Sequence, residues 1–433
     1  MRICLQCYRG NPYCGGQGIY LHNLSRALVK LGHEVTVLVG PPYPNPMPWV
    51  REIRLLNKCL WGIKIKDLLL LHDLKSLLTP LNFFEYVVSR TGYCPEPLAF
   101  SLRAALKFRE LHQAEPFDVL HDVETLGFGL LLARAHGVPA VSTVHHPLRR
   151  DLAAFLPRAT SWRERYHNTV FYPLIMQGMV ARRIDGMITS SHVGLKELRQ
   201  AFRVKKEKIH LVYTGVNTVT FSPDPSVERT PHEILFVGNA DDPRKGIRYL
   251  LEAMLDLPPD VRLIMVDKGE PDKHYAPDLI RSMGLDGRVT FTGRLSESEL
   301  VERYRRTQAL VMPSLFEGFG LPVAEAMACG TPVVTTRTGS LPEVVGSDQE
   351  GGLLVPPKNP GALAEAIHQI ISEPVFSKEL GLRARRRVER LFSWDRTAEN
   401  TVQVYKKLIS QQMLRRKAAF AKGTSQCIGT KIN

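Results

Sequence analysis

The chain has 433 residues, of which 44% are hydrophobic, and this length exceeds what one typical hydrophobic core contains. Its formal net charge of +14 indicates an anionic partner: nucleic acid, anionic lipid or the phosphates of a substrate. The arginines are spread along the chain without the interleaved aromatic residues of RNA-binding motifs, and no run of about 18 uncharged apolar residues predicts a transmembrane helix.

The first half of the chain alternates strand-like and helix-like segments. A strand over residues 2–8 precedes an amphipathic helix over residues 16–31, and apolar runs predict further strands at residues 35–39, 117–121, 140–144 and 186–190. This alternation is typical of a parallel sheet with helices on both faces. Residues 41–97 break the rhythm, and we expect a long inserted loop with short helices there.

The seven cysteines form no recognisable framework. Cys4 and Cys7 have the spacing of a redox or metal pair, but an offset of three residues within a strand points them to opposite faces. Scattered thiols favour a reducing compartment. No second Cys/His pair accompanies Cys4 and Cys7, so we expect no zinc site. Because Met1 is followed by Arg2 and a strand-like segment instead of an apolar signal region, we expect a cytoplasmic protein.

The second half of the chain begins a new sheet. Residues 217–232 are polar and carry prolines, so we interpret them as a linker. Strands are expected at residues 233–238, 261–266, 289–292, 309–312 and 332–335, and residues 383–415 are expected to be largely helical. The sequence therefore predicts an α/β fold with two Rossmann-like domains, over residues 1–220 and 221–410, and a disordered basic tail over residues 411–433. Two such domains facing each other would enclose a central cleft, because ligands bind beyond the carboxyl ends of parallel strands.

The first glycine-rich loop lies between the first strand and the first helix. Adjacent Gly15 and Gly16 let the backbone approach an anion at the helix start. Their spacing is not that of the dinucleotide-binding motif, and a plain flexible turn is the alternative.

Farther along, His145 and His146 end the strand at residues 140–144, and Glu124 is a candidate for the acceptor side, with a solvated loop as its alternative.

A pair of cations marks the start of the second sheet. Its first strand ends at Gly238, and Arg244 and Lys245 directly precede a predicted helix. Cations are disfavoured at a helix N-terminus, so this pair predicts an anion opposite, such as a leaving diphosphate. The alternative is a solvated surface pair.

After the strand at residues 289–292, the main chain of Arg294 and Leu295 is expected to face a nucleotide base.

The most informative segment runs from residue 316 to residue 332. Glu317 and Glu325 flank a glycine-rich turn, and Pro322 suits the first turn of a helix. The N–H groups of Gly320 and Leu321, next to Phe319, would then form an anion site at the helix start. A phosphate with hydroxyl-rich groups on both sides describes a nucleotide-sugar.

This segment resembles the E-x7-E signature of retaining glycosyltransferases of family 4, which have the two-domain GT-B fold. The resemblance extends from Met1 to about Tyr405 and implies a C-terminal helix that returns to the first domain. It implies that Glu317 meets the donor sugar, that Glu325 holds the ribose hydroxyls and that His145, with His146 as the alternative, contacts the transferred sugar. Asn239 stands where the family often has an arginine.

The resemblance implies a retaining hexosyltransferase. The sequence has no Asp-x-Asp carboxylate pair, so a metal-bridged diphosphate is not needed and we expect metal-independent transfer. The expected nucleotide-sugar contacts are Gly15, Gly16, Gly238, Arg294, Leu295, Phe319, Gly320, Leu321 and Glu325, and the expected catalytic residues are Arg244, Lys245, Glu317 and His145. No cofactor is expected beyond the nucleotide-sugar donor, and the acceptor could be a glycan, a lipid carrier or a metabolite. A sugar-nucleotide epimerase of the same fold and a basic nucleic-acid-binding or lipid-binding protein are the alternatives, although we expect no nucleic-acid partner.

Two stretches of the first domain mix apolar and basic residues, at residues 64–88 and 148–183. The second contains Phe155, Leu156, Trp162, Phe171 and Tyr172 among arginines. Basic residues near an anionic leaflet and apolar side chains both favour binding at a membrane surface. This predicts peripheral association with the inner membrane face, and a solvated basic face over an ordinary core is the alternative.

Overall fold

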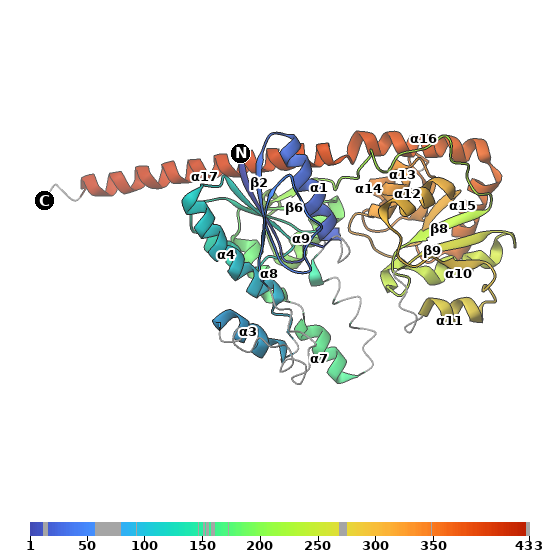
Figure 1. Ribbon diagram of the computed structural model, residues 1–433, viewed down its shortest axis with the longest axis horizontal. Helices are drawn as coiled ribbons and strands as arrows, with labels where there is room; N and C mark the ends of the chain where they lie inside the picture. Colours follow the sequence, from blue (N-terminus) through green and yellow to red (C-terminus); the bar gives the residue numbers. More distant parts are fainter. Residues whose placement is uncertain are drawn as a thin grey trace. The chain divides into compact units, whose positions relative to one another are not determined.

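The computed structural model describes residues 1–11, 16–56, 79–91, 93–145, 147–149, 152, 156, 161–171, 173–267, 275–347 and 349–429. The chain forms two compact units (Figure 1). Unit 1 comprises Met1–Thr189, Leu195–Val212 and Ala398–Asn433, and unit 2 comprises Ser190–Gly194 and Tyr213–Thr397. Each unit is built on one parallel sheet, which confirms the α/β fold with two Rossmann-like domains.

Unit 1 contains a seven-stranded sheet with the order β3-β2-β1-β4-β5-β6-β7. Its strands are β1 (Arg2–Cys7), β2 (Glu34–Val39), β3 (Arg51–Arg54), β4 (Val119–Val123), β5 (Ala140–Thr143), β6 (Gly186–Thr189) and β7 (Ile209–Leu211). Its helices are α1 (Gly16–Lys30), α3 (Pro80–Ser89), α4 (Glu96–Ala114), α5 (Gly129–Arg134), α7 (Trp162–Phe171), α8 (Leu174–Arg183) and most of α9 (His192–Phe202). The central strands are almost entirely buried because helices cover both faces of the sheet, and they carry buried polar residues such as His121 and Thr143 among the apolar ones.

The inserted stretch at residues 41–97 contains more regular structure than the sequence predicts. Strand β3 pairs with β2 at the sheet edge, with Val37 opposite Glu52. An edge strand of this kind has no apolar run, because one side of it has no neighbouring strand and its side chains reach solvent. Helix α3 follows, and residues 57–78 lie outside the described part of the chain.

Unit 2 contains a six-stranded sheet with the order β10-β9-β8-β11-β12-β13. Its strands are β8 (Glu233–Val237), β9 (Arg262–Val266), β10 (Val289–Phe291), β11 (Ala309–Met312), β12 (Val333–Thr336) and β13 (Leu353–Val355). Its helices are the 3₁₀ turn η5 (Pro243–Lys245), α10 (Ile247–Asp256), α11 (Tyr275–Ser282), α12 (Glu297–Arg306), α13 (Leu321–Ala328), α14 (Leu341–Val345), α15 (Pro360–Ser372) and α16 (Pro374–Leu391).

The segment that the sequence presents as a linker is bound to unit 2. Arg385 of α16 donates to the carbonyl oxygens of Thr218 (3.0 Å) and Phe221 (2.8 Å), and Arg305 of α12 donates to that of Ser222 (2.8 Å). The division between the units accordingly lies between Val212 and Tyr213, upstream of the expected boundary after residue 220. These three hydrogen bonds are accepted by main-chain carbonyl oxygens, so they do not depend on the polar side chains of the segment.

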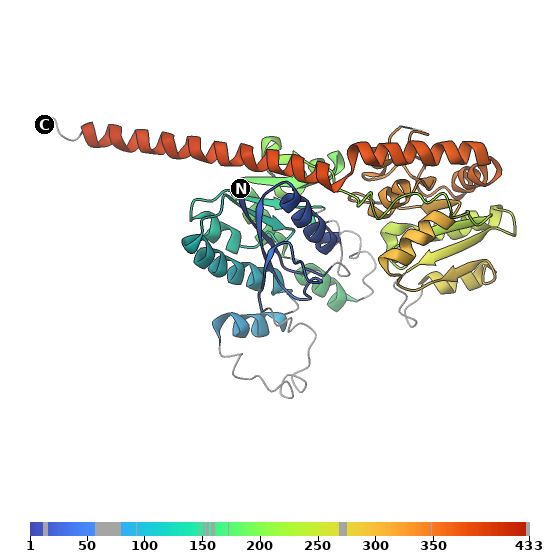
Figure 2. The same cartoon turned by 45° about the horizontal axis from the view of Figure 1, so that its top comes forward.

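The last helix, α17 (Trp394–Gly429), is one continuous helix in both views of the molecule (Figures 1 and 2). From Ala398 onward it belongs to unit 1, where Tyr405 and Leu408 are buried, so the expected return of the C-terminal helix to the first domain is confirmed. The structure differs from the expected disordered tail, because the helix continues to Gly429 through good helix formers such as Leu414 and Arg415. Among the described residues, no helix is long and apolar enough to span a membrane.

Candidate active site

A group of side chains in unit 2 that includes the predicted residues Lys245 and Glu317 lies at the carboxyl ends of three neighbouring strands. In the order β8-β11-β12, the loop after β8 carries Lys245, the loop after β11 carries Glu317 and the loop after β12 carries Ser340. The loops after β8 and β11 approach each other closely at Gly246, which has φ 64° and ψ 26°. A Cβ atom at this position would lie 2.3 Å from the carbonyl oxygen of Pro313, so this contact requires glycine.

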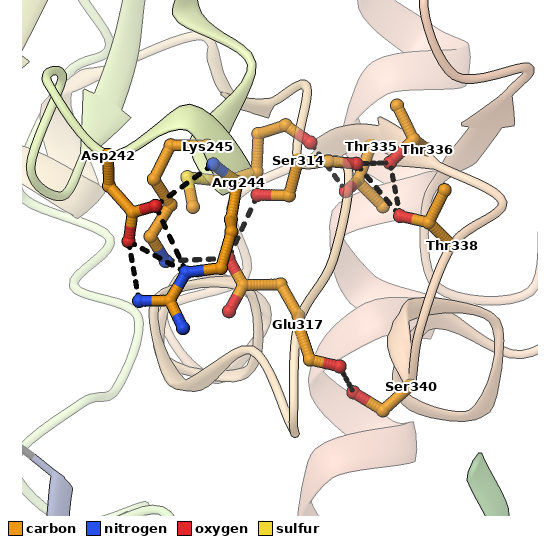
Figure 3. Close-up of polar contacts among 10 residues, drawn as sticks. Asp242, Arg244, Lys245, Ser314, Glu317, Thr335, Thr336, Thr338 and Ser340 are labelled. Atoms are coloured by element: carbon orange, nitrogen blue, oxygen red, sulfur yellow. Dashed lines mark hydrogen bonds and ion pairs between the residues drawn. The ribbon is translucent and has the colours of Figure 1, made fainter. Parts of the chain in front are cut away.

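Lys245 and Glu317 form an ion pair across these loops (Figure 3). Lys245 Nζ donates to Glu317 Oε1 over 2.6 Å, and Ser314 Oγ donates to the same oxygen over 2.8 Å. The two side chains retain 19% and 11% of their exposure, so water screens the pair only in part. The structure therefore brings together two residues that the sequence predicts to act at the same substrate.

The main chain around Glu317 is held on both sides. Its carbonyl oxygen accepts from Ser340 N (3.2 Å) and Ser340 Oγ (3.1 Å). The hydroxyls of Thr336 and Thr338 donate to the carbonyl oxygen of Ser314, as Figure 3 shows. A carboxylate on a glycine-rich turn is thus fixed by side chains from the neighbouring strand and loop.

Arg244 is paired with a carboxylate of its own loop. Its Nε donates to Asp242 Oδ1 over 3.0 Å and its Nη2 to Asp242 Oδ2 over 2.7 Å. Burial alone would raise the pKa of Asp242, but hydrogen bonds from Arg244 and the charges of Arg244 and Lys245 hold that pKa below its ordinary value. Both cations of the predicted diphosphate site therefore have carboxylate partners, and Lys245 has two further N–H donors with which to meet an anion.

Glu325 lies one turn inside α13, whose N-cap residue Gly320 has φ 93° and ψ 53°. The first N–H groups of this helix, including that of Leu321, have no carbonyl partner within the helix. Tyr304 of α12 donates its hydroxyl proton to Glu325 Oε2 over 3.0 Å. Burial raises the pKa of Glu325 to about 7, against the smaller lowering effect of the Tyr304 hydrogen bond, so this carboxylate is costly to ionise.

Of the remaining residues of unit 2 that the sequence predicts to contact the nucleotide, some lie beside the Lys245–Glu317 ion pair and others lie on a more distant loop. Gly238 has φ 148°, and a Cβ atom there would stand 3.5 Å from Lys245 Cε, so the lysine side chain passes over the Gly238 backbone. Phe319 is buried beside Gly320. Arg294 is exposed and Leu295 half-buried on the loop after β10, and strand β9 separates β10 from β8.

In unit 1, His145 lies two residues after the end of β5 and is half-buried. Its backbone N–H donates to Glu124 Oε1 over 3.1 Å, and its ring meets that of Tyr20 at 5.0 Å between centroids. Glu124 has φ 61°, a conformation that side chains disfavour and that is enriched at functional sites. Gly16 is exposed at the start of α1, whereas Gly15 and His146 lie outside the described residues.

Three residues that hydrogen-bond to predicted site residues of unit 2 are not identified from the sequence. Tyr304 stands between arginines in a helix that carries three glutamates and three arginines, and nothing in this sequence marks it as the partner of Glu325. Ser314 follows an apolar strand without any motif. Asp242 has a weak signal, because an aspartate that precedes Pro-Arg can cap a helical turn, as it does at η5.

No group of three or more His, Cys, Asp or Glu side chains in the described part of the chain is arranged to hold a metal ion. Cys4, Cys7, Cys94 and Cys329 are buried free thiols.

Comparison with known proteins relates both units to sugar transfer. Residues 14–220 match the profile of Glycosyltransferase Family 4, and residues 220–387 match that of Glycosyl transferases group 1. The chain is 37% identical over 414 residues to the MMP alpha-(1->4)-mannosyltransferase of Mycolicibacterium hassiacum, covering 95% of this chain and 99% of that one. It is 27% identical over 424 residues to the glycogen synthase of Mycobacterium tuberculosis, covering 94% of each chain. Among solved structures, the sucrose-phosphate synthase of Thermosynechococcus elongatus superposes with a TM-score of 0.69 at 26% identity, over 95% of this chain and 100% of the other.

Proposed function

The chain belongs to glycosyltransferase family 4 and has the GT-B fold, and we propose that it is a retaining, metal-independent hexosyltransferase that forms an α linkage to a sugar hydroxyl. It uses a nucleotide-sugar donor. The observation that carries the proposal is the Lys245–Glu317 ion pair beside the start of α13, because it joins a cation, a carboxylate and helix N–H groups at one sheet edge.

In this proposal, unit 2 binds the donor in three parts. Glu325 accepts hydrogen bonds from the ribose hydroxyls, and the N–H groups of Gly320 and Leu321 meet the diphosphate. Glu317 accepts hydrogen bonds from hydroxyls of the donor sugar through its second oxygen, Oε2, while Oε1 stays bound to Lys245 and Ser314. The fixed main chain around Glu317 supports this role, because an acceptor of sugar hydroxyls must be held in place before the substrate arrives.

The chemical step replaces one C–O bond by another at the anomeric carbon. The bond to the diphosphate breaks, the acceptor hydroxyl oxygen attacks from the same face, and its proton passes to the departing phosphate oxygen. Negative charge therefore grows on the diphosphate as the bond breaks. Lys245 Nζ can stabilise this charge by donating hydrogen bonds from the N–H groups that are not bonded to Glu317. Arg244 contributes its positive charge from beside the same loop. His145 of unit 1 contacts the transferred sugar.

The name of the relative with 37% identity favours a mannosyl donor and an α-(1→4) linkage for this chain. Glucosyl transfer is the second candidate, because the glycogen synthase relative spans the chain at 27% identity. Both relatives have names that favour a glycan acceptor over a lipid carrier or a small metabolite.

A donor and acceptor panel tests the proposal. The protein is incubated with guanosine or uridine diphosphate mannose and glucose, with and without an α-linked manno- or gluco-oligosaccharide, and release of nucleoside diphosphate is measured. We expect release that depends on the acceptor, with a mannosyl donor preferred. Release or isomerisation of the donor without any acceptor would indicate the epimerase alternative, and no release with any pair would overturn the proposal.

We also propose that unit 1 binds anionic membrane surfaces from the cytoplasmic side. In the described residues, Trp162 is 73% exposed and Tyr166 57% exposed on α7, and Arg163 and Arg165 are exposed beside them. On α3, Phe83 is 59% exposed. Exposed aromatic and basic side chains together favour an anionic interface. Phe155 and Tyr172, which the sequence places in the same surface, lie outside the described residues.

A further inference from the structure

Behind His145, a line of buried polar side chains joins the C-terminal helix to the sheet of unit 1. The hydroxyl of Tyr405 in α17 lies 2.5 Å from His121 Nδ1, and His121 Nε2 lies 2.7 Å from Thr143 Oγ1. Thr143 Oγ1 lies 3.1 Å from the hydroxyl of Tyr20 in α1. These four linked side chains, the hydroxyl–imidazole chain, belong to residues that are at most 2% exposed, so water does not compete for their hydrogen bonds.

The imidazole at the centre of this chain is neutral. Burial, together with the smaller effect of the charge on His145, lowers the pKa of His121 to about 3. A neutral imidazole donates from one ring nitrogen and accepts at the other. The hydroxyls of Tyr405 and Thr143 can each donate or accept a hydrogen bond, so these two hydroxyls and the His121 imidazole can all be paired at once. Loss of either hydroxyl would interrupt the hydroxyl–imidazole chain.

Tyr20 connects the hydroxyl–imidazole chain to His145. The rings of Tyr20 and His145 meet edge to face, with 5.0 Å between centroids and an interplanar angle of 76°. The backbone of His145 is fixed separately, through its N–H and Glu124. The ring of His145 can therefore be turned by a shift of Tyr20 while its main chain stays in place.

We propose that Tyr405 and His121 are positioning residues that hold Tyr20, and through it the orientation of the His145 ring. Docking of α17 onto unit 1 then sets the geometry of a side chain that acts on the transferred sugar. The consequence for catalysis rests on the proposed function, whereas the orientation of the ring can be measured independently of activity.

The Y405F variant tests this positioning, because it removes the hydroxyl and keeps the ring. The Cε1–H signals of ¹³C-labelled histidine are recorded by NMR, and the His145 signal is identified by its absence in H145Q. We expect Y405F to shift the His145 signal and to lower kcat about 10- to 100-fold, with donor Kd within about twofold of the unsubstituted protein. The matched control is L408A, since Leu408 is buried on the same helix, packs against Gly186 of β6 and has no side-chain group that could hydrogen-bond in the hydroxyl–imidazole chain. It should lower Tm and leave the His145 signal unchanged.

Two further variants keep the test decisive if Y405F does not fold. T143V breaks the hydroxyl–imidazole chain, whereas T143S keeps its hydroxyl, so the His145 signal should move in the first and return in the second. An unmoved signal in Y405F or T143V would overturn the positioning, and so would an equal shift in L408A, which would assign the effect to helix docking alone. A shifted signal combined with a fully active H145Q would support the positioning and overturn only the proposed role of His145 in transfer.

Discussion

Replacing Glu325 by glutamine should make the protein more stable and its donor site weaker. Burial raises the pKa of the Glu325 carboxyl from the ordinary 4.5 to about 7 in the folded protein. The unfolded chain ionises this group near pH 4.5, and the folded chain resists ionisation until about pH 7. The stability that protonated Glu325 contributes is therefore complete below pH 4.5 and is lost as the pH rises through 7.

The size of this effect follows from the shift. At about 1.36 kcal/mol for each pKa unit, ionised Glu325 lowers the free energy of unfolding by at most about 3 kcal/mol at pH 8. Glutamine has nearly the same shape, can accept the Tyr304 hydrogen bond and does not ionise. The stability advantage of E325Q should therefore grow by about 2 kcal/mol between pH 5 and pH 8.

Urea unfolding of both proteins at pH 5, 6, 7 and 8 measures this advantage, and calorimetry measures donor affinity. The loss of a carboxylate that accepts hydrogen bonds from the ribose hydroxyls should weaken donor binding by about 1.5–3 kcal/mol. The matched control is E297Q: Glu297 is exposed and acts on Glu325 only through charge repulsion, so its removal should change stability little. A stability difference that does not vary with pH, or an E325Q protein that is less stable at pH 8, would refute the reasoning.

Three further predictions concern Lys245, metal ions and the membrane surface. K245M should lower kcat about 10²- to 10³-fold with a smaller effect on donor Kd, because charge on the diphosphate grows as the bond breaks, whereas R248M on the exposed face of α10 should keep wild-type turnover. A near wild-type kcat for K245M in steady-state assays would assign Lys245 a structural role only. Turnover should persist in EDTA, and loss that Mg²⁺ or Mn²⁺ restores would contradict a metal-independent mechanism. The protein should cosediment at low salt with vesicles that contain anionic lipid, W162A/Y166A should bind them less, and absence of binding by the unsubstituted chain would contradict the membrane proposal.

The central strands of both sheets were predictable because they are buried on both faces. β1, β6 and β11 read as short apolar runs, and each begins where the sequence predicts. The edge strand β3, with the sequence Arg-Glu-Ile-Arg, carries no such signal, and the apolar run of strand β13 has only three residues. Their pairing depends on the neighbour that each strand meets in the folded sheet, which local sequence does not encode.

The candidate site shows the same division between local and long-range information. Glycine spacing and the misplaced cations predict an anion near Lys245 and Gly320, because helix starts and turns are local features. The pairing of Lys245 with Glu317 joins positions 72 residues apart and depends on β8 and β11 being neighbours. The contact between His121 and Tyr405 spans 284 residues and depends on the return of α17 to unit 1.

The stereochemistry of the product tests the central claim most directly. The protein is incubated with an α-configured nucleoside diphosphate mannose and a manno-oligosaccharide, and the one-bond C–H coupling at the new anomeric carbon is measured by NMR. Retaining transfer predicts an α-linked product formed in proportion to the nucleoside diphosphate released. A β-linked product, or nucleoside diphosphate released without any glycosylated acceptor, would contradict it.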